Sequence, residues 1–351
     1  QLTMAVETNA GGKTKRKLRR ASRGPILLAL LLLLVPISAA SLALGSRVIP
    51  LEETFQALTA YNPTLDSHLI VHELRIPRTI LAMLAGASLG LAGALMQSLT
   101  RNALAEPGTL GVNAGAAAGV VIGLAFTGSG KIIVYIWFAF AGAAIASVLV
   151  HRLGRAGESG VNPVRLVLAG AGLSITLSSL TMMVTLSSSQ QVFDSFRNWA
   201  TGSLQGRGWE VLPILAVCLA IGALIAVVLT GSLNAISLGR DMAQGLGVNI
   251  TRTWALTNLA ILILAGAATA AVGPVSFIGL AAPHVARSLV GPNHRWLLPY
   301  SAVIAAIILL TADVVGRVII LPGEIGAGIM SALIGAPFST ALVRRGRAEA
   351  T

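Results

Sequence analysis

Long apolar segments recur along the whole chain, and they constrain its fold more than any other feature. The first runs from Gly24 to Gly45, and others follow at intervals as far as residue 342. A helix needs about 20 apolar residues to cross roughly 30 Å of hydrocarbon. Only 11% of the 351 residues are charged, whereas soluble domains carry about 25%. The sequence therefore predicts an all-α, polytopic membrane protein with little room for a soluble domain.

We expect about ten membrane-spanning helices. The apolar windows place them near residues 26–46, 76–98, 109–126, 132–150, 164–187, 211–230, 254–272, 276–290, 297–316 and 326–342. The eighth is short and contains Pro283, so we expect a broken helix there, and nine spans is the alternative. The predicted domains are a basic tail over residues 1–25, a transmembrane domain over 26–343 and a basic tail over 344–351.

The basic residues are gathered where they indicate topology. The formal net charge is +12, and lysines and arginines cluster just before the first apolar segment and just after the last. Basic residues that flank membrane spans mark the cytoplasmic side. We therefore expect both termini in the cytoplasm and contact with membrane lipid. Nucleic-acid binding is excluded as a function class, because no folded basic module is predicted.

Two short motifs resemble chemical sites but lack essential parts. Gly12-Lys13-Thr14 resembles the end of a phosphate-binding loop, but Glu7 stands where that loop needs a glycine. His68 and His72 could share a metal on one helix face, yet no third ligand is evident, and a surface helix explains them equally. We expect no metal, no cofactor and no catalytic set in this chain, so any ATP hydrolysis belongs to a partner subunit.

Ionisable residues at membrane depth are the informative exceptions, because a charge that faces lipid is costly. Asp313 and Arg317 are four residues apart, so they can pair on one helix face. Arg75 and Arg78 flank the predicted outer start of the second span. The three arginines could form a docking ring for carboxylates of an external protein, or they could simply reach the membrane interface. The polar segment 188–210 is expected outside, with an amphipathic helix on the membrane surface.

Glycines recur every four residues in the third predicted span, at Gly111, Gly115, Gly119 and Gly123. That spacing lines them along one helix face and favours close packing against a neighbouring helix over lining of a pore.

Several motifs follow one another along the chain in a recognisable order. They are Arg75-Ile76-Pro77-Arg78, Gln97, Arg101 to Pro107, Gly273 to Arg287, Asp313 with Arg317, Gly323-Glu324, and Ile334 to Phe338. In these motifs the chain resembles the iron–siderophore and vitamin B12 (FecCD-type) permease family of ABC importers over residues 70–343. The resemblance implies a type II ABC importer permease fold in the bacterial inner membrane. It also implies three partners: a second permease subunit, identical or homologous, two ABC ATPase subunits that carry ATP and Mg²⁺, and a periplasmic or lipoprotein substrate-binding protein.

The resemblance also assigns roles to particular positions. Arg75, Arg78 and Arg317 match the outer arginines that receive acidic residues of the binding protein. The segment that matches the ATPase-coupling helix comprises Leu238, Gly239, Arg240, Asp241, Met242, Ala243, Leu246 and Gly247. Its sequence agrees, because Met242 and Leu246 share a helix face that could dock on a partner. The positions that match the cytoplasmic gate are Asn102 and Leu104, with Pro163 and Val164 as a second layer.

These expectations combine into a transport hypothesis. The chain would translocate a metal chelate by alternating access, with ferric siderophore as the first choice and cobalamin or haem as alternatives. Ser174, Thr176, Ser178, Ser179 and Thr181 would give the cavity wall weak polar contacts. An ion-coupled secondary transporter is a different class, and it would need Asp313 or His284 as a proton relay. A membrane scaffold without transport is the third alternative.

Overall fold

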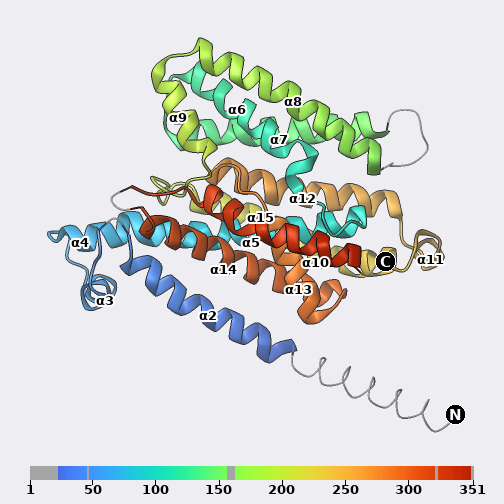
Figure 1. The fold of residues 1–351 in the computed structure, drawn as a ribbon, viewed down its shortest axis with the longest axis horizontal. Coiled ribbons are helices and arrows are strands. Elements are labelled where there is room, and N and C mark those ends of the chain that lie inside the picture. The colour runs from blue at the N-terminus through green and yellow to red at the C-terminus, as the bar shows by residue number, and fades with distance from the viewer. Residues whose placement is uncertain (1–22, 46, 156–162, 321–322, 349–351) are drawn as a thin grey trace, which may run out of the picture.

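The structure is a computed structural model that describes residues 23–45, 47–155, 163–320 and 323–348. These residues form a helical bundle (Figure 1). In chain order the elements are α2 (Arg23–Ala43), α3 (Leu51–Thr59), α4 (Asp66–Leu69), η1 (Ile70–Arg75), α5 (Ile76–Thr100), η2 (Pro107–Leu110), α6 (Val112–Thr127), α7 (Ile132–Arg155), α8 (Pro163–Ser187), α9 (Gln190–Ala200), α10 (Leu212–Ser237), α11 (Arg240–Gly245), α12 (Ile250–Val272), α13 (Ile278–Val290), α14 (His294–Val318) and α15 (Ala327–Ala348).

The predicted fold class is confirmed, since each of the predicted spans overlaps a helix of the structure. Within the described ranges, 7 helices are long and apolar enough to cross a membrane, and Val112–Thr127 and Ala327–Pro337 are shorter apolar helices. Helix α13 has 13 residues, which at 1.5 Å each reach only about two thirds of the way across the hydrocarbon. Much of the basic N-terminal tail, with Gly12-Lys13-Thr14, lies outside the described residues.

Helix α5 forms the centre of the bundle and contacts α14, α12, α13 and α10. Its glycines permit this, because a Cβ on Gly86 would lie 2.7 Å from the main-chain oxygen of Ala305 on α14. The predicted glycine ridge of the third span is confirmed as a packing device. A Cβ on Gly115 or Gly119 would overlap main-chain atoms of α7. Small residues therefore set the distances between the central helices.

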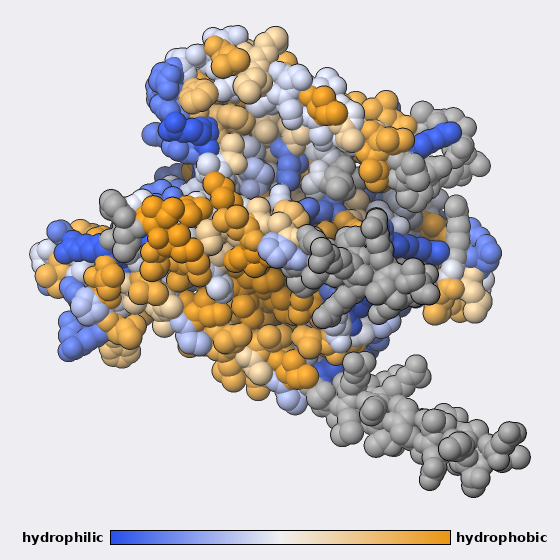
Figure 2. Space-filling model, in the orientation of Figure 1, coloured by the Kyte–Doolittle hydropathy of each residue, from blue (hydrophilic) through white to orange (hydrophobic). Residues whose placement is uncertain are grey.

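On the face shown in Figure 2, apolar side chains gather over the middle of the bundle, and hydrophilic side chains are found towards its two ends. At one end lie α3, α4 and η1, and at the other lies α11 (Figure 1). We call these the α4 end and the α11 end. The charge pattern of the sequence predicts that the α4 end is outside and the α11 end is cytoplasmic.

The helical structure is interrupted between α12 and α13, at residues 273–277. The sequence predicted a broken helix in this region, but α13 itself continues through Pro283, so the interruption lies before the helix and not within it. Gly273 and Phe277 both adopt positive φ angles, of 83° and 69°. A Cβ at Gly273 would meet the main-chain oxygen of Trp199, so only glycine fits that position. The break places main chain, rather than a continuous helix, against α9 and the loop that follows α5.

Helix α9 confirms the helix expected within the polar segment 188–210. Its Trp199 is buried and donates from Nε1 to the carbonyl of Ala270 at 3.3 Å. This aromatic residue therefore packs into the protein and not onto a membrane surface.

Candidate docking, coupling and gate sites

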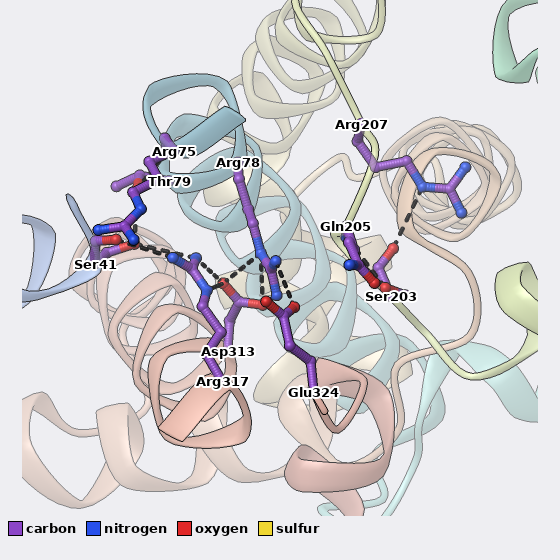
Figure 3. Close-up of polar contacts among 10 residues, drawn as sticks. All are labelled: Ser41, Arg75, Arg78, Thr79, Ser203, Gln205, Arg207, Asp313, Arg317 and Glu324. Carbon is purple, nitrogen blue, oxygen red and sulfur yellow. Dashed lines mark hydrogen bonds and ion pairs between the residues drawn. The ribbon is translucent and has the colours of Figure 1, made fainter. Parts of the chain in front are cut away.

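A buried network of ion pairs occupies the α4 end (Figure 3). Asp313 on α14 has no exposed surface. It receives hydrogen bonds from Arg78 on α5, with Nη2 to Oδ1 at 2.8 Å and Nε to Oδ2 at 3.1 Å. Arg317, one helical turn along α14, donates to the same carboxylate, with Nε to Oδ2 at 3.0 Å. The Asp313–Arg317 pair predicted from the sequence is therefore confirmed, and a second guanidinium shares its acid.

Further contacts extend this network to other segments of the chain. Arg78 Nη1 pairs with Glu324 Oε2 at 2.7 Å, in the connection between α14 and α15. Arg317 Nη1 donates to the carbonyl of Ser41 on α2 at 2.9 Å. Arg75 donates to the carbonyls of Leu42 and Arg47. We call Arg75, Arg78, Asp313, Arg317 and Glu324 the arginine cluster.

The arginine cluster brings together the three arginines expected to receive acidic residues, but it already supplies their partners. Arg75, Arg78 and Arg317 are all buried, and each guanidinium is bound within the chain. A buried charge without a partner is strongly destabilising. The internal contacts of these three arginines are therefore what allows them to be buried. Docking at these arginines stays a prediction, and it requires an exchange of partners.

Two recesses lie beside the arginine cluster. The larger has a volume of about 1020 Å³ and is lined by Arg78, Lys131, Tyr135, Arg207 and Glu324, among others. The smaller, of about 290 Å³, is lined by Arg75, Arg78, Arg207, Arg317 and Glu324, among others. The α4 end is therefore hollowed next to its buried charges.

Helix α11 forms the predicted coupling segment at the α11 end. Leu238, Met242 and Leu246 are 67%, 62% and 65% exposed, whereas Ala243 is buried against the bundle. Gly239 and Gly247 bracket the helix with positive φ angles of 127° and 78°. The segment is thus a short projection that presents large apolar side chains outward. Its role in coupling to an ATPase stays a prediction.

The predicted gate residues lie in two different elements. Asn102 and Leu104 form a tight turn after α5, in which Asn102 Oδ1 accepts from the Leu104 N–H at 2.9 Å. Both side chains are exposed. Pro163 and Val164 are the first residues of α8. Their role as a gate stays a prediction.

Glu106 is a functional candidate that sequence reasoning passed over. It follows the gate turn, and its Oε1 accepts from the main-chain N–H of Phe277 at 2.8 Å, where the chain breaks before α13. Burial raises the pKa of the Glu106 carboxyl above its ordinary value, and the hydrogen bond from Phe277 opposes that rise. The gate turn is thereby tied to the interruption before α13. The sequence placed Glu106 within the Arg101 to Pro107 motif, but that motif assigned it no role.

The hydroxyl groups expected along the cavity wall lie on α8. Those of Thr176, Ser179 and Thr181 donate to carbonyls of their own helix, four residues back. Thr181 is buried, whereas Ile175, Leu180 and Met182, which are next to these residues in the sequence, are exposed. Helix α8 thus offers a mainly apolar face with internally satisfied hydroxyls.

The histidines considered as metal ligands have other partners. His68 Nδ1 accepts from the Asn62 N–H at 3.0 Å, and His72 Nε2 lies 3.0 Å from the carbonyl of Ala57. Across the described ranges, no three His, Cys, Asp or Glu residues are placed to hold a metal ion.

Comparisons with known proteins agree with this architecture. Residues 30–345 match the model of the FecCD transport family. The chain is 44% identical to the ferric enterobactin transport system permease protein FepD of Escherichia coli (strain K12), over 90% of this chain and 94% of that protein. It is 38% identical to the probable siderophore transport system permease protein YfiZ of Bacillus subtilis (strain 168), over 93% and 98%. A metal-chelate type ABC transporter solved in an inward-facing conformation is similar with a TM-score of 0.78 at 29% identity, over 92% and 99% of the two chains. The chain belongs to the FecCD transport family.

Proposed function

We propose that this chain is the permease subunit of an ABC importer that carries a ferric siderophore from a binding protein outside to the cytoplasm. One observation carries the proposal. A charged cluster beside recesses and an exposed apolar helix lie at opposite ends of one apolar helical bundle. A membrane subunit with two such ends is suited to receive cargo from a binding protein at one end and to contact an ATPase at the other.

Three kinds of partner follow from this arrangement. An ABC ATPase, present twice and carrying ATP and Mg²⁺, binds Leu238, Met242 and Leu246 at the α11 end. A second permease, identical or homologous, completes the pathway along the mainly apolar face of α8. A periplasmic or lipoprotein binding protein docks at the α4 end. Both termini are then cytoplasmic, in agreement with the basic clusters near the ends of the chain.

Docking proceeds by exchange of carboxylates. The side chain of Glu324 is 16% exposed, whereas that of Asp313 is fully buried. A carboxylate of the binding protein can therefore replace Glu324 at Arg78 without disturbing Asp313. Guanidinium binds either carboxylate in the same planar geometry, so the exchange needs little rearrangement of the arginine. The displaced Glu324 leads into α15, so docking is transmitted to a helix that reaches the α11 end.

The gate responds to movement at the α11 end. ATP-driven movement of α11 is transmitted to α10 and α12, which it joins. Arg101, just before the gate turn, donates from Nη2 to the carbonyl of Ile236 on α10 at 2.6 Å. Movement of α10 therefore pulls on the turn that carries Asn102 and Leu104. Glu106 then couples that turn to the break before α13.

The carried chelate follows from the similar proteins. The relatives reported above are named for ferric enterobactin and for siderophore transport, which favours a ferric siderophore over cobalamin or haem. Of the two proton relays that an ion-coupled carrier could use, Asp313 is disfavoured, because it is held between two guanidinium groups and is not free to relay protons.

The test is transport by reconstituted proteoliposomes. Liposomes that contain the permease, its ATPase and its binding protein should accumulate ⁵⁵Fe-siderophore only when ATP is enclosed with the ATPase. Liposomes with the permease alone and a proton or sodium gradient are the control. Uptake by the permease alone would replace this proposal with a secondary carrier, and no uptake under either condition would favour a scaffold.

A further inference from the structure

Arg207 is a buried cation that lacks an acidic partner. It lies in the loop between α9 and α10 and is 7% exposed. Its Nη1 donates to the Tyr135 hydroxyl at 2.5 Å and its Nε to the carbonyl of Ser203 at 3.3 Å, and both acceptors are neutral. Among the described residues, no carboxylate lies within ion-pair distance of this guanidinium. Arg78 and Arg317, by contrast, are buried around Asp313.

The loop that carries Arg207 is held in place from two sides. The carbonyl of Gly202 accepts from the Gly328 N–H at 2.9 Å, at the start of α15. Trp209 donates from Nε1 to the carbonyl of His72 on η1 at 3.2 Å. Figure 3 shows Arg207 apart from the arginine cluster, with its Nε directed at Ser203. The position of the guanidinium is therefore built into the fold, as a preorganised site requires.

Arg207 lines both recesses at the α4 end. The larger one, of about 1020 Å³, also contains Lys131, Glu210 and Glu324. The smaller one contains Glu73 and Glu324 together with further arginines, which are Arg47, Arg75, Arg78 and Arg317. Glu324 is already paired with Arg78. Basic side chains thus outnumber acidic ones around the recesses, and the potential there favours an anion.

Burial of a cation without an opposing charge is costly, and an arriving anion recovers that cost. A guanidinium suits delocalised oxygen anions, because its planar N–H groups bind two oxygens at once. We propose that Arg207 is the seat for anionic oxygens of the chelate as it enters the permease, namely carboxylate or catecholate oxygens of a negatively charged ferric complex. This inference rests on the proposed function. The Arg207 guanidinium is bound by neutral groups, so a small anion can bind it without the displacement of Glu324 that docking at Arg78 requires.

The test is direct binding to the full chain in nanodiscs of phosphatidylcholine, a lipid without net charge. Equilibrium dialysis would compare an anionic ⁵⁵Fe tricatecholate with a neutral ⁵⁵Fe trihydroxamate. Arg207→Gln should weaken binding of the anionic probe about tenfold, the size of one charge-assisted hydrogen bond, and leave the neutral probe unchanged. Arg207→Lys should lose less, because it keeps the charge. Tyr135→Phe should have a smaller effect than Arg207→Gln, because it removes only the group that orients Arg207.

The matched control is Arg295→Gln, the same chemical change at an exposed position where α14 begins. It should bind both probes as the unaltered chain does. The inference is overturned if the unaltered chain does not bind the anionic probe, if Arg207→Gln binds it equally well, or if that variant loses both probes equally. ATP-driven uptake in proteoliposomes separates the two proposals. Uptake that is insensitive to Arg207→Gln overturns the anion seat alone, and anion binding without uptake overturns the transport function alone.

Discussion

The two ends of the molecule present opposite chemistry to their surroundings. At the α4 end, charged side chains are buried and already paired with one another, as in the Arg78–Asp313 and Arg78–Glu324 ion pairs. At the α11 end, large apolar side chains project outward without protein cover within the described chain. The α4 end therefore buries the groups that could bind a partner, whereas the α11 end exposes them.

This difference indicates two kinds of binding. A partner that docks on the arginines of the α4 end must replace an internal carboxylate by one of its own. The gain in binding free energy is then only the small difference between two similar ion pairs. Such binding is suited to a protein that comes and goes. A partner at the α11 end covers apolar surface that is otherwise exposed, which gives a gain roughly proportional to area and favours a permanent subunit. Variants at each end can test this contrast.

The largest effect is expected at Asp313, the centre of the arginine cluster. Asp313→Ala leaves Arg78 and Arg317 buried without their shared acid, and such a loss costs about 3–5 kcal/mol. We expect a fall of that size in the free energy of unfolding, or failure to accumulate folded protein, measured by thermal unfolding in detergent. The control is Asp194→Ala, which breaks the exposed Arg197–Asp194 pair and should cost less than about 1 kcal/mol. Equal effects from the two variants would contradict the buried-network description.

The next effect is expected at α11 and concerns binding instead of stability. Met242→Asp or Leu246→Asp places a charge in the exposed apolar face, and a central interface residue contributes about 2 kcal/mol or more. We expect the ATPase to bind about 30-fold more weakly, measured by co-purification and titration, while the free energy of unfolding changes by less than about 0.5 kcal/mol. Leu51→Asp, at an exposed leucine of α3, should leave ATPase binding intact. Loss of the ATPase in that control too would show a general defect.

Local sequence patterns predicted the parts of the molecule that depend on neighbours along the chain. Apolar windows predicted the helices, because burial in lipid requires about 20 apolar residues wherever a span occurs. The four-residue spacing of Asp313 and Arg317 predicted their pair, because helix geometry places such residues on one face. The exposed face of Met242 and Leu246 was predicted by the same geometry.

The contacts that tie the α4 end together could not be predicted in this way. Arg78 is separated from Asp313 by 235 residues and from Glu324 by 246, and no periodic pattern relates such distant positions. The three arginines are buried by contacts with distant parts of the chain, so the sequence did not predict their accessibility. Arg207 went unnoticed because its partners, a hydroxyl and a carbonyl, leave no charge pattern to detect.

A moderate effect is expected at Glu106, which ties the gate turn to the break before α13. Glu106→Ala removes the acceptor of the Phe277 N–H and should lower the free energy of unfolding by about 1–3 kcal/mol. Glu106→Gln keeps an acceptor and should be nearly neutral. Because burial raises the folded-state pKa, the contribution of Glu106 to stability is fully present below its unfolded pKa and is lost as pH rises through the folded value. Unfolding measured against pH should show that loss in the unaltered chain and not in Glu106→Gln.

The smallest effect is expected at Glu324, and it tests the exchange of carboxylates directly. Glu324→Gln weakens the internal competitor for Arg78, so we expect the binding protein to be captured a few-fold more tightly. The loss in free energy of unfolding should be limited, because Arg78 keeps its ion pair with Asp313 and the substituted amide can still accept a hydrogen bond. The measurement is binding of the cognate binding protein to the permease in nanodiscs at low and high salt. The control is Glu210→Gln, which removes a nearby exposed acid that has no ion pair among the described residues. Any tighter capture of the binding protein by this control should vanish at high salt, because salt screens long-range attraction. A gain for Glu324→Gln that persists at high salt supports local exchange at Arg78, whereas weaker capture by this variant would mean that Glu324 itself contacts the binding protein.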